Sequence, residues 1–441
     1  MTLPYGINAP TRAERLDALR NHVRENINGI NDVAFTEQVN NHVHTTYSFS
    51  PYSPAAAAWS ARAAGLRAVG SVDHDSIAAA TEMLEACSLL AIGGTVGCEL
   101  RVSFAGTPLE GRRINNPDGE TLAYIVFHGV PAPRISEVDA YLAPIRDRRN
   151  ERNREQTEAM SGLLAAAGAP APTFNDVVAV SNASEGGSIT ERHILYAASR
   201  ALVDWLGRGE SLRRFVEDAL SGPLRARLRG YLDDEANPHY VYDLLGALRS
   251  SFLPRFYVQP SGAECPPVAE AVELANSIAA IPAYAYLGDV AESPTGDKKA
   301  AAFEDGYLEE LFQVIAGIGF RAVTYMPPRN TVTQLLRVQA LCRRHALMEI
   351  SGVDINSSRQ DFTCEEILRP EFRHLTDATW ALVAHERLSS ASPDYSLFSP
   401  RNPVGGDLPG RIERYAAIGR ALDPRHPDDA VTVAGFEGGS R

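Results

Sequence analysis

The sequence predicts an α/β fold in which short apolar strands alternate with helices. From residue 38 onward, apolar runs of strand length are followed by a polar cluster and then by an alanine-rich stretch of helical character. The run over residues 122–127 is almost wholly apolar, as is typical of strands in parallel sheets that are covered on both faces. Polar side chains gather where the runs end. We therefore expect a largely parallel sheet with its chemistry at one rim.

The predicted strands fall into two groups that are separated by a less regular segment. The first group covers residues 39–44, 67–72, 95–104 and 122–127, and the second covers residues 279–287, 320–325 and 347–351. Apolar spacing or alanine content predicts helices over residues 11–30, 54–64, 77–90 and 137–168. Pro and Gly clusters interrupt the rhythm over residues 169–262, which predicts a helical insertion.

Composition restricts the classes of partner and the cellular compartment. The net charge of -13 over 441 residues argues against a nucleic-acid partner, because such binding depends on Lys and Arg patches. The five cysteines are scattered, odd in number and without CxxC spacing, so neither a disulfide framework nor a zinc-thiolate site is predicted. No apolar run has the length of a signal peptide or of a membrane span. We expect a cytoplasmic protein with no membrane partner.

Histidines and carboxylates recur at the ends of the predicted strands. His42 and His44 end the first strand and point to the same side of it, which suits a metal ion, although a His-x-His pair also occurs by chance. The other metal-competent side chains are Asp73, His74, Glu99, His128, Asp289 and Asp354, with His193 in the insertion. Imidazole and carboxylate without thiolate suit Zn, Mn or Fe. We expect divalent metal ions, two in number, with one or three as alternatives.

The order of these motifs resembles that of the PHP (polymerase and histidinol phosphatase) superfamily. The resemblance covers roughly residues 38–360 and rests on His42-Val43-His44, Asp73-His74-Asp75, Glu99, His128 and Gly352-Val353-Asp354-Ile355-Asn356. It implies a distorted (β/α)7 TIM-like barrel with a helical insertion and phosphoesterase activity. The segment Thr190-Glu191-Arg192-His193-Ile194 is similar to the Thr-Arg-Pro-His-Ile segment of one branch, with Glu191 where that Arg would stand.

The resemblance also implies a division of the chain. We expect an N-terminal helical extension over residues 1–37, the two parts of the barrel over residues 38–168 and 263–362, the insertion over residues 169–262, and a C-terminal helical extension and tail over residues 363–441.

Carried onto this chain, the family pattern implies a set of ligands for each ion. A first ion would take His42, His44, Glu99 and Asp354, a second would take Glu99, His128 and His193, and a third would need His74 with two further groups. Phe49, Tyr286 and Asn356 stand where the pattern has an acidic residue and two histidines. Phe49 cannot bind a metal, and an amide or phenol oxygen is a poorer zinc ligand than imidazole. A third ion would depend on a substitute such as Asp289, and Asn356 is a weak candidate ligand.

The expected activity is hydrolysis of a small phosphorylated substrate. A metal-activated hydroxide near Glu99 would attack phosphorus, and His74 or His193 would assist proton transfer to the leaving oxygen. Candidate substrate-binding residues are Arg101, Arg192, Lys298 and Lys299. For Arg101 the alternative to substrate binding is an ion pair with Glu99. For the two lysines the alternative is a place in a solvated loop. The basic run over residues 146–154 predicts a solvated helix face, with anion binding as the alternative.

Two other functions stay open at this point. The same kind of metal-binding rim serves carbon-nitrogen hydrolases of the amidohydrolase kind, and the fold does not decide between the two chemistries. The departures at Phe49, Tyr286 and Asn356 also allow a metal-binding module without catalytic activity.

Overall fold

The computed structural model describes residues 3–117, 119–290 and 302–436. In this part of the chain seven strands form one curled sheet, in which the strands lie in chain order. The strands are β1 (Val39–Val43), β2 (Ala68–His74), β3 (Gly93–Ser103), β4 (Leu122–His128), β5 (Ile281–Tyr286), β6 (Ala322–Tyr325) and β7 (Met348–Ser351). Most of their residues are buried, as expected for a sheet with helices packed on it.

The sheet closes almost completely where its first strand meets the segment that follows its last strand. Val43 forms a parallel bridge with Ile355. The amide of His44 donates to the Ile355 carbonyl at 3.0 Å, and the amide of Ile355 donates to the His42 carbonyl at 3.1 Å. The structure is therefore a seven-stranded TIM-like barrel, which confirms the predicted fold class.

Strand β4 runs against its neighbours, and this differs from the expected parallel order. It pairs antiparallel with both β3 and β5, whereas the other neighbouring strands pair in parallel. His128 ends β4 but pairs with Ile281, the first residue of β5. The expectation that β4 ends at the same rim as the other strands is wrong. An apolar run indicates that a strand is buried, but it does not reveal the direction of that strand.

Helices cover the outside of the barrel. They are α2 (Pro54–Ala63), α3 (Ala80–Leu89), α10 (Val268–Ser277), α11 (Leu308–Ile318), α12 (Val332–His345) and α13 (His374–Ala391). Helix α2 is capped by Ser53, whose hydroxyl accepts from the Ala56 amide at 3.1 Å, and it has proline at the first helical position. Helix α13 is buried against β1, β3 and β7, so the start of the C-terminal region forms part of the barrel wall. On it pack α14 (Leu408–Ala421) and α15 (Ala430–Ala434).

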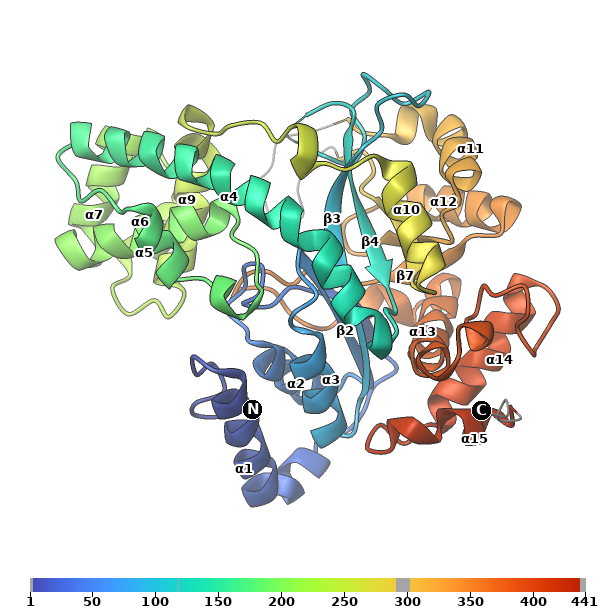
Figure 1. The fold of residues 1–441 in the computed structure, drawn as a ribbon. Coiled ribbons are helices and arrows are strands. Elements are labelled where there is room, and N and C mark those ends of the chain that lie inside the picture. Colours follow the sequence, from blue (N-terminus) through green and yellow to red (C-terminus); the bar gives the residue numbers. More distant parts are fainter. Residues whose placement is uncertain (1–2, 118, 291–301, 437–441) are drawn as a thin grey trace.

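The insertion has a hydrophobic core of its own. Its helices are α4 (Ile135–Ala166), which continues from the barrel, and α5 (Phe174–Ala179), α6 (Glu191–Leu206), α7 (Glu210–Phe215), α8 (Ala226–Asp233) and α9 (Tyr240–Ser251). Figure 1 shows these green helices gathered beside the barrel. In the described residues the core of the barrel and the core of the insertion form separate clusters, and Phe49 from the loop after β1 belongs to the second.

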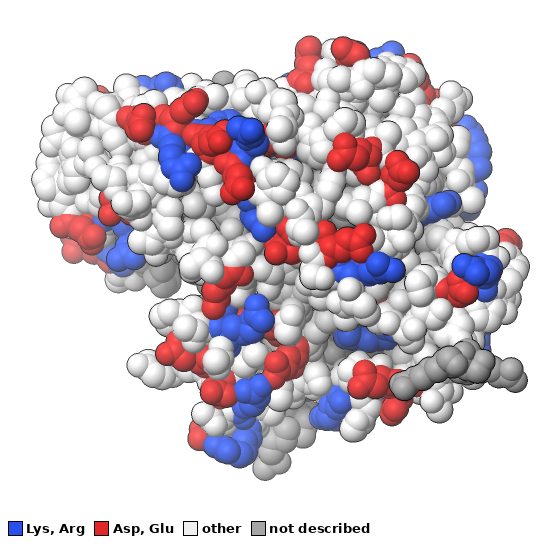
Figure 2. All heavy atoms as spheres, in the orientation of Figure 1, with Lys and Arg blue, Asp and Glu red and all other residues white. Residues whose placement is uncertain are grey.

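A buried ion-pair network attaches the N-terminal helix to the rest of the molecule. Arg15 of α1 (Arg12–Asn31) pairs with Glu82 of α3 at 2.7 Å and with Glu185 of the insertion at 2.9 Å. Charges of both signs are interspersed on the face drawn in Figure 2. Among the described residues, none of the helices has both the length and the apolar composition that crossing a bilayer requires.

Candidate metal centre

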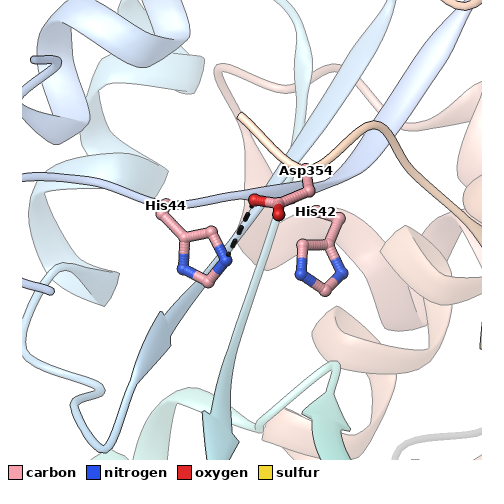
Figure 3. Close-up of side chains that lie close together, drawn as sticks. All are labelled: His42, His44 and Asp354. Atoms are coloured by element: carbon pink, nitrogen blue, oxygen red, sulfur yellow. Dashed lines mark ion pairs between the residues drawn. The ribbon is translucent and has the colours of Figure 1, made fainter. Parts of the chain in front are cut away.

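Five side chains converge at the carboxyl-terminal rim of the parallel strands: His42, His44, His74, Glu99 and Asp354. His42 lies in β1 and His44 follows that strand, while Asp354 lies in the loop after β7. Figure 3 shows both imidazoles near the Asp354 carboxylate, and His44 Nε2 lies 3.4 Å from Asp354 Oδ1. The cluster therefore lies where the barrel closes.

Glu99 connects the two sides of this cluster. It lies on β3 opposite His74, the last residue of β2. Its Oε2 atom lies 3.1 Å from His74 Nδ1, 3.6 Å from His44 Nε2 and 3.8 Å from His42 Nε2. Among the described residues, the ligand atoms form two overlapping groups: His42 with His44 and Asp354, and His44 with His74 and Glu99. Because the Nε2 lone pair binds one ion, His44 serves one group at a time.

The donor set and its spacing fit a divalent ion. Two ligands that each lie about 2.1 Å from a tetrahedral ion are themselves about 3.4 Å apart. The ion-pair distances of the cluster lie between 3.1 and 3.8 Å, and His42, His44 and Glu99 are buried. Imidazole nitrogen and carboxylate oxygen are ligand types that suit a divalent ion.

The protonation of the three histidines also suits metal binding. Burial, together with the charge of His42, lowers the pKa of His44. Burial, and then the neighbouring His44 and Arg149, hold the pKa of His74 well below 6.5. Burial opposes protonation of His42 as well, but the carboxylate of Glu99 outweighs it and raises the pKa of His42. His44 and His74 therefore present free lone pairs at neutral pH, and an incoming cation displaces a proton near His42.

The loop that carries Asp354 is held closely against β1. A Cβ atom on Gly352 would lie 2.5 Å from the Cβ of His42, so only glycine fits there. The side chain of Gln360 donates to the backbone carbonyl of Asp354 at 2.6 Å and accepts from the backbone amide of Asn356 at 2.8 Å. The Asn356 side chain donates to Asp354 Oδ1 at 2.5 Å and so orients that carboxylate, while its own role as a ligand stays a prediction.

Two of the predicted histidine ligands lie outside both groups. His128 has a buried Nε2 atom with no hydrogen-bond partner among the described residues, and burial, reinforced by His42, lowers its pKa to about 3. His193 uses Nδ1 to accept the Thr190 amide at 3.0 Å at the start of α6. The structure does not bring either residue together with Glu99 in a described ligand group. His193 is held by this bond at the start of α6, and His128 ends a strand that runs against its neighbours.

The residues that depart from the family pattern, and the substitute ligand considered for them, make contacts outside the ligand groups. Phe49 packs edge-on against His193 with ring centroids 5.0 Å apart, inside the core of the insertion. Tyr286 donates its hydroxyl to Asp305 at 2.6 Å. Asp289, the proposed substitute ligand, accepts the Phe303 amide at 2.6 Å and belongs to neither group. These contacts give a third ion no complete ligand set among the described residues.

Arginines from the barrel and the insertion surround the cluster. Arg101 pairs with Glu264 at 3.4 Å rather than with Glu99, and its Nη2 donates to the Tyr124 hydroxyl at 2.5 Å. Arg192 donates to the side-chain oxygen of Asn356 at 2.8 Å and forms no ion pair within the described part of the chain. The other two candidates, Lys298 and Lys299, lie outside the described residues.

The basic run on helix α4 is only partly exposed to solvent, whereas the sequence predicts a solvated face. Arg148 and Arg154 are exposed, but Arg149 and Arg152 are buried. Arg149 pairs with Asp75 and, at 3.4 Å, with Glu191, while Arg152 binds Glu264 through two hydrogen bonds of 2.7 and 2.6 Å. The signal in the sequence is the helical spacing of polar residues at 149, 152, 153 and 156, which places them on one buried face.

Comparisons with known proteins give fold likenesses of low identity. No protein-family model matches the chain, and no curated protein matches its sequence. A proposed metal-dependent phosphoesterase from Bifidobacterium adolescentis matches with a TM-score of 0.48 and 17% identity, covering 75% of this chain and 94% of its own. An amidohydrolase from Chromobacterium violaceum, with bound sulfate and no metal, matches with a TM-score of 0.49 and 19% identity, covering 77% and 96%.

Proposed function

We propose that the protein is a metal-dependent hydrolase of the PHP type that cleaves phosphate esters of small molecules. The cluster of three imidazoles around the Glu99 carboxylate supports the metal dependence. The observation that carries the phosphoester preference is the environment of Arg192. This half-buried cation lies against Asn356, two residues from Asp354, and no carboxylate of the described residues lies within ion-pair distance of it.

The charges near His74 favour an anionic substrate over a neutral amide. Burial and His44 contribute most to the lowered pKa of His74, and Arg149, Arg192 and Arg101 lower it further. Positive charge therefore surrounds His74 even without a metal. Asp75 and Glu191 balance Arg149, and Glu264 balances Arg101. Burial, and then the nearby Arg249, lowers the pKa of Arg192 to about 10, and the carboxylates of Asp354 and Glu191 offset this only in part. A phosphate ester would bring a further anion to this guanidinium.

The roles of the chain's own residues follow from their positions. Bound divalent ions would supply an activated water and would stabilise the charge of the phosphoryl group. His42, His44 and Asp354 would hold the first ion, and Glu99, which belongs to the second group, lies 3.8 Å from His42 Nε2. The side chain of His74 is 28% exposed, more than those of His42 and His44, and so it is best placed to meet the leaving oxygen. Glu99, 3.1 Å from its Nδ1, orients the ring.

Substrate panels test this proposal. Metal-stripped and Mn²⁺-reloaded protein would be assayed against phosphate monoesters, amides and lactones. We expect phosphate release only from the reloaded protein, and no turnover of neutral amides. Hydrolysis of amides in preference to phosphate esters would overturn the proposal in favour of a carbon-nitrogen hydrolase. Absence of all turnover with at most one bound ion would indicate a non-catalytic module instead.

A variant of Arg192 sharpens the comparison. Arg192→Gln removes this cation, so we expect KM for phosphate esters to rise by about tenfold or more while the metal content stays the same. Arg148→Gln is the matched control, since the Arg148 side chain is 58% exposed and pairs with Glu151 on the surface of α4. Equal KM values for the two variants would contradict the role of Arg192.

A further inference from the structure

The end of β2 carries a carboxylate that does not face the metal cluster. Asp73, next to His74, is buried and contacts the segment that follows β1. Its Oδ1 accepts the Thr45 amide at 2.6 Å and the Ser48 hydroxyl at 2.7 Å, and its Oδ2 accepts the Thr45 hydroxyl at 2.6 Å. Asp73 thus holds together the short segment that begins immediately after His44.

Ser48 connects this carboxylate to a proposed metal ligand. Its Oγ atom lies 3.4 Å from His44 Nδ1 and is the hydrogen-bond partner of that nitrogen among the described residues. The shorter distance, 2.7 Å to Asp73, shows that the serine proton lies on the side of the carboxylate. A hydroxyl has one proton, so toward His44 the oxygen of Ser48 can only accept. The hydrogen of the His44 ring then belongs on Nδ1.

We infer that Asp73 and Ser48 are positioning residues that fix His44 in the tautomer protonated at Nδ1, and this inference rests on the proposed metal-dependent function. The opposite nitrogen, Nε2, is then a free lone pair, and it is the atom that lies 3.4 Å from Asp354 and 3.6 Å from Glu99. Ligand histidines generally need such a partner on the second nitrogen, and its loss lowers metal affinity by about 10- to 100-fold.

The opposite tautomer would leave this network incomplete. If His44 carried its hydrogen on Nε2, Ser48 would have to donate to Nδ1, and Asp73 Oδ1 would lose one of its two donors in a buried site. The imidazole of His44 also stacks on that of His74, with ring centroids 4.5 Å apart and an interplanar angle of 23°. Stacking fixes the plane of the ring, and the serine fixes which nitrogen carries the hydrogen.

Nuclear magnetic resonance on the metal-free full-length protein tests the tautomer directly. With ¹⁵N-labelled histidine, long-range ¹H–¹⁵N correlations report which ring nitrogen is protonated, and His44→Gln assigns the signal. We expect the Nδ1-protonated form of His44 at neutral pH, a change toward the Nε2-protonated form in Ser48→Ala, and restoration in Ser48→Thr. Ser199→Ala is the control, since Ser199 is buried and its hydroxyl donates to the Leu195 carbonyl in α6, far in sequence from the ligands. An Nε2-protonated His44 in the wild type, or no change in Ser48→Ala, would overturn the inference.

Zinc affinity gives a second, independent measurement. Competition with a chromophoric chelator should show Zn²⁺ binding weakened by about 10- to 100-fold in Ser48→Ala and unchanged in Ser199→Ala. Equal affinities in the two variants would overturn the positioning role. Because neither measurement uses a substrate, a protein that shows the expected tautomer and affinities but hydrolyses no phosphate ester would contradict the proposed function and leave the positioning role intact.

Discussion

His44 Nε2 lies 3.4 Å from Asp354 Oδ1, so the first strand of the barrel and the loop after its last strand supply adjacent ligands. The backbone bridge between Val43 and Ile355 joins the same two segments. An ion held by His44 and Asp354 would therefore reinforce the closure of the barrel.

Metal binding should raise the thermal stability of the protein. An ion that binds the folded state alone stabilises it by about 2.7 kcal/mol at a hundred times its Kd. Calorimetry with Zn²⁺ should show a rise in Tm of a few degrees for the wild type and little or none for Asp354→Asn. The control is Asp377→Asn on α13, whose carboxylate is half exposed and pairs with Arg420. A similar rise in Asp354→Asn would contradict the assignment of Asp354 as a ligand.

Metal affinity should depend on pH through His42. Glu99 raises the pKa of His42 although burial opposes it, so below that pKa the imidazole is protonated and a cation must displace the proton. Affinity should therefore increase as pH rises toward the pKa of His42 and then level off. Titration calorimetry in buffers of different ionisation enthalpy should detect proton release on metal binding at pH values below that pKa. Affinity that does not vary between about pH 6 and 8 would exclude this role of His42.

Phe49 should act as a core residue of the insertion. It is buried against His193, Tyr196 and Tyr242. Phe49→Ala should lower the free energy of unfolding by about 3–5 kcal/mol. Phe49→Asp should destabilise at least as much, because it also buries a carboxylate, and it should not add a bound ion. Denaturant unfolding measures the stability of both variants, and elemental analysis counts the bound ions. Phe35→Ala is the control for stability, since Phe35 is partly exposed. An extra ion in Phe49→Asp would mean that phenylalanine alone blocks a third site.

Glu386 should make the protein less stable as pH rises toward neutrality. Burial raises its pKa from 4.5 to about 7, against the opposing charge of Arg387, while its carboxyl accepts the Val96 amide at 2.7 Å. Between these pH values the folded state holds a proton that the unfolded state has lost, so the free energy of unfolding falls as pH rises, by about 3 kcal/mol at most. Glu386→Gln keeps an acceptor for Val96 and removes this dependence. Denaturant unfolding at about pH 5 and pH 7.5 should therefore show a smaller difference for Glu386→Gln than for the wild type. Equal pH dependence in the two proteins would refute the prediction.

The strand ends were informative in the sequence because parallel strands deliver their last residues to one rim. His42, His44, His74, Glu99 and Asp354 were predicted on that basis and with the help of the family resemblance, and the structure brings them together. The TIM-like barrel was predicted in the same way and is confirmed.

Other features of the site depend on tertiary contacts that sequence patterns do not encode. Strand direction decided the place of His128, since an apolar run reads the same in both directions. In the sequence, Arg149 and Arg152 look like part of a solvated charged face. Their burial becomes evident only with their carboxylate partners, such as Glu264. Asp73 has the residue type of a metal ligand, but its hydrogen bonds to Thr45 and Ser48 turn it toward another segment.

The most direct test of the central claim is the release of inorganic phosphate from p-nitrophenyl phosphate as metal-stripped protein is titrated with Mn²⁺. We predict no turnover without metal, recovery as one to two equivalents bind, and a loss of about a hundredfold or more in His44→Gln at the same metal concentration. Equal turnover in the stripped and reloaded proteins would contradict the proposal that this cluster is the metal centre of a hydrolase.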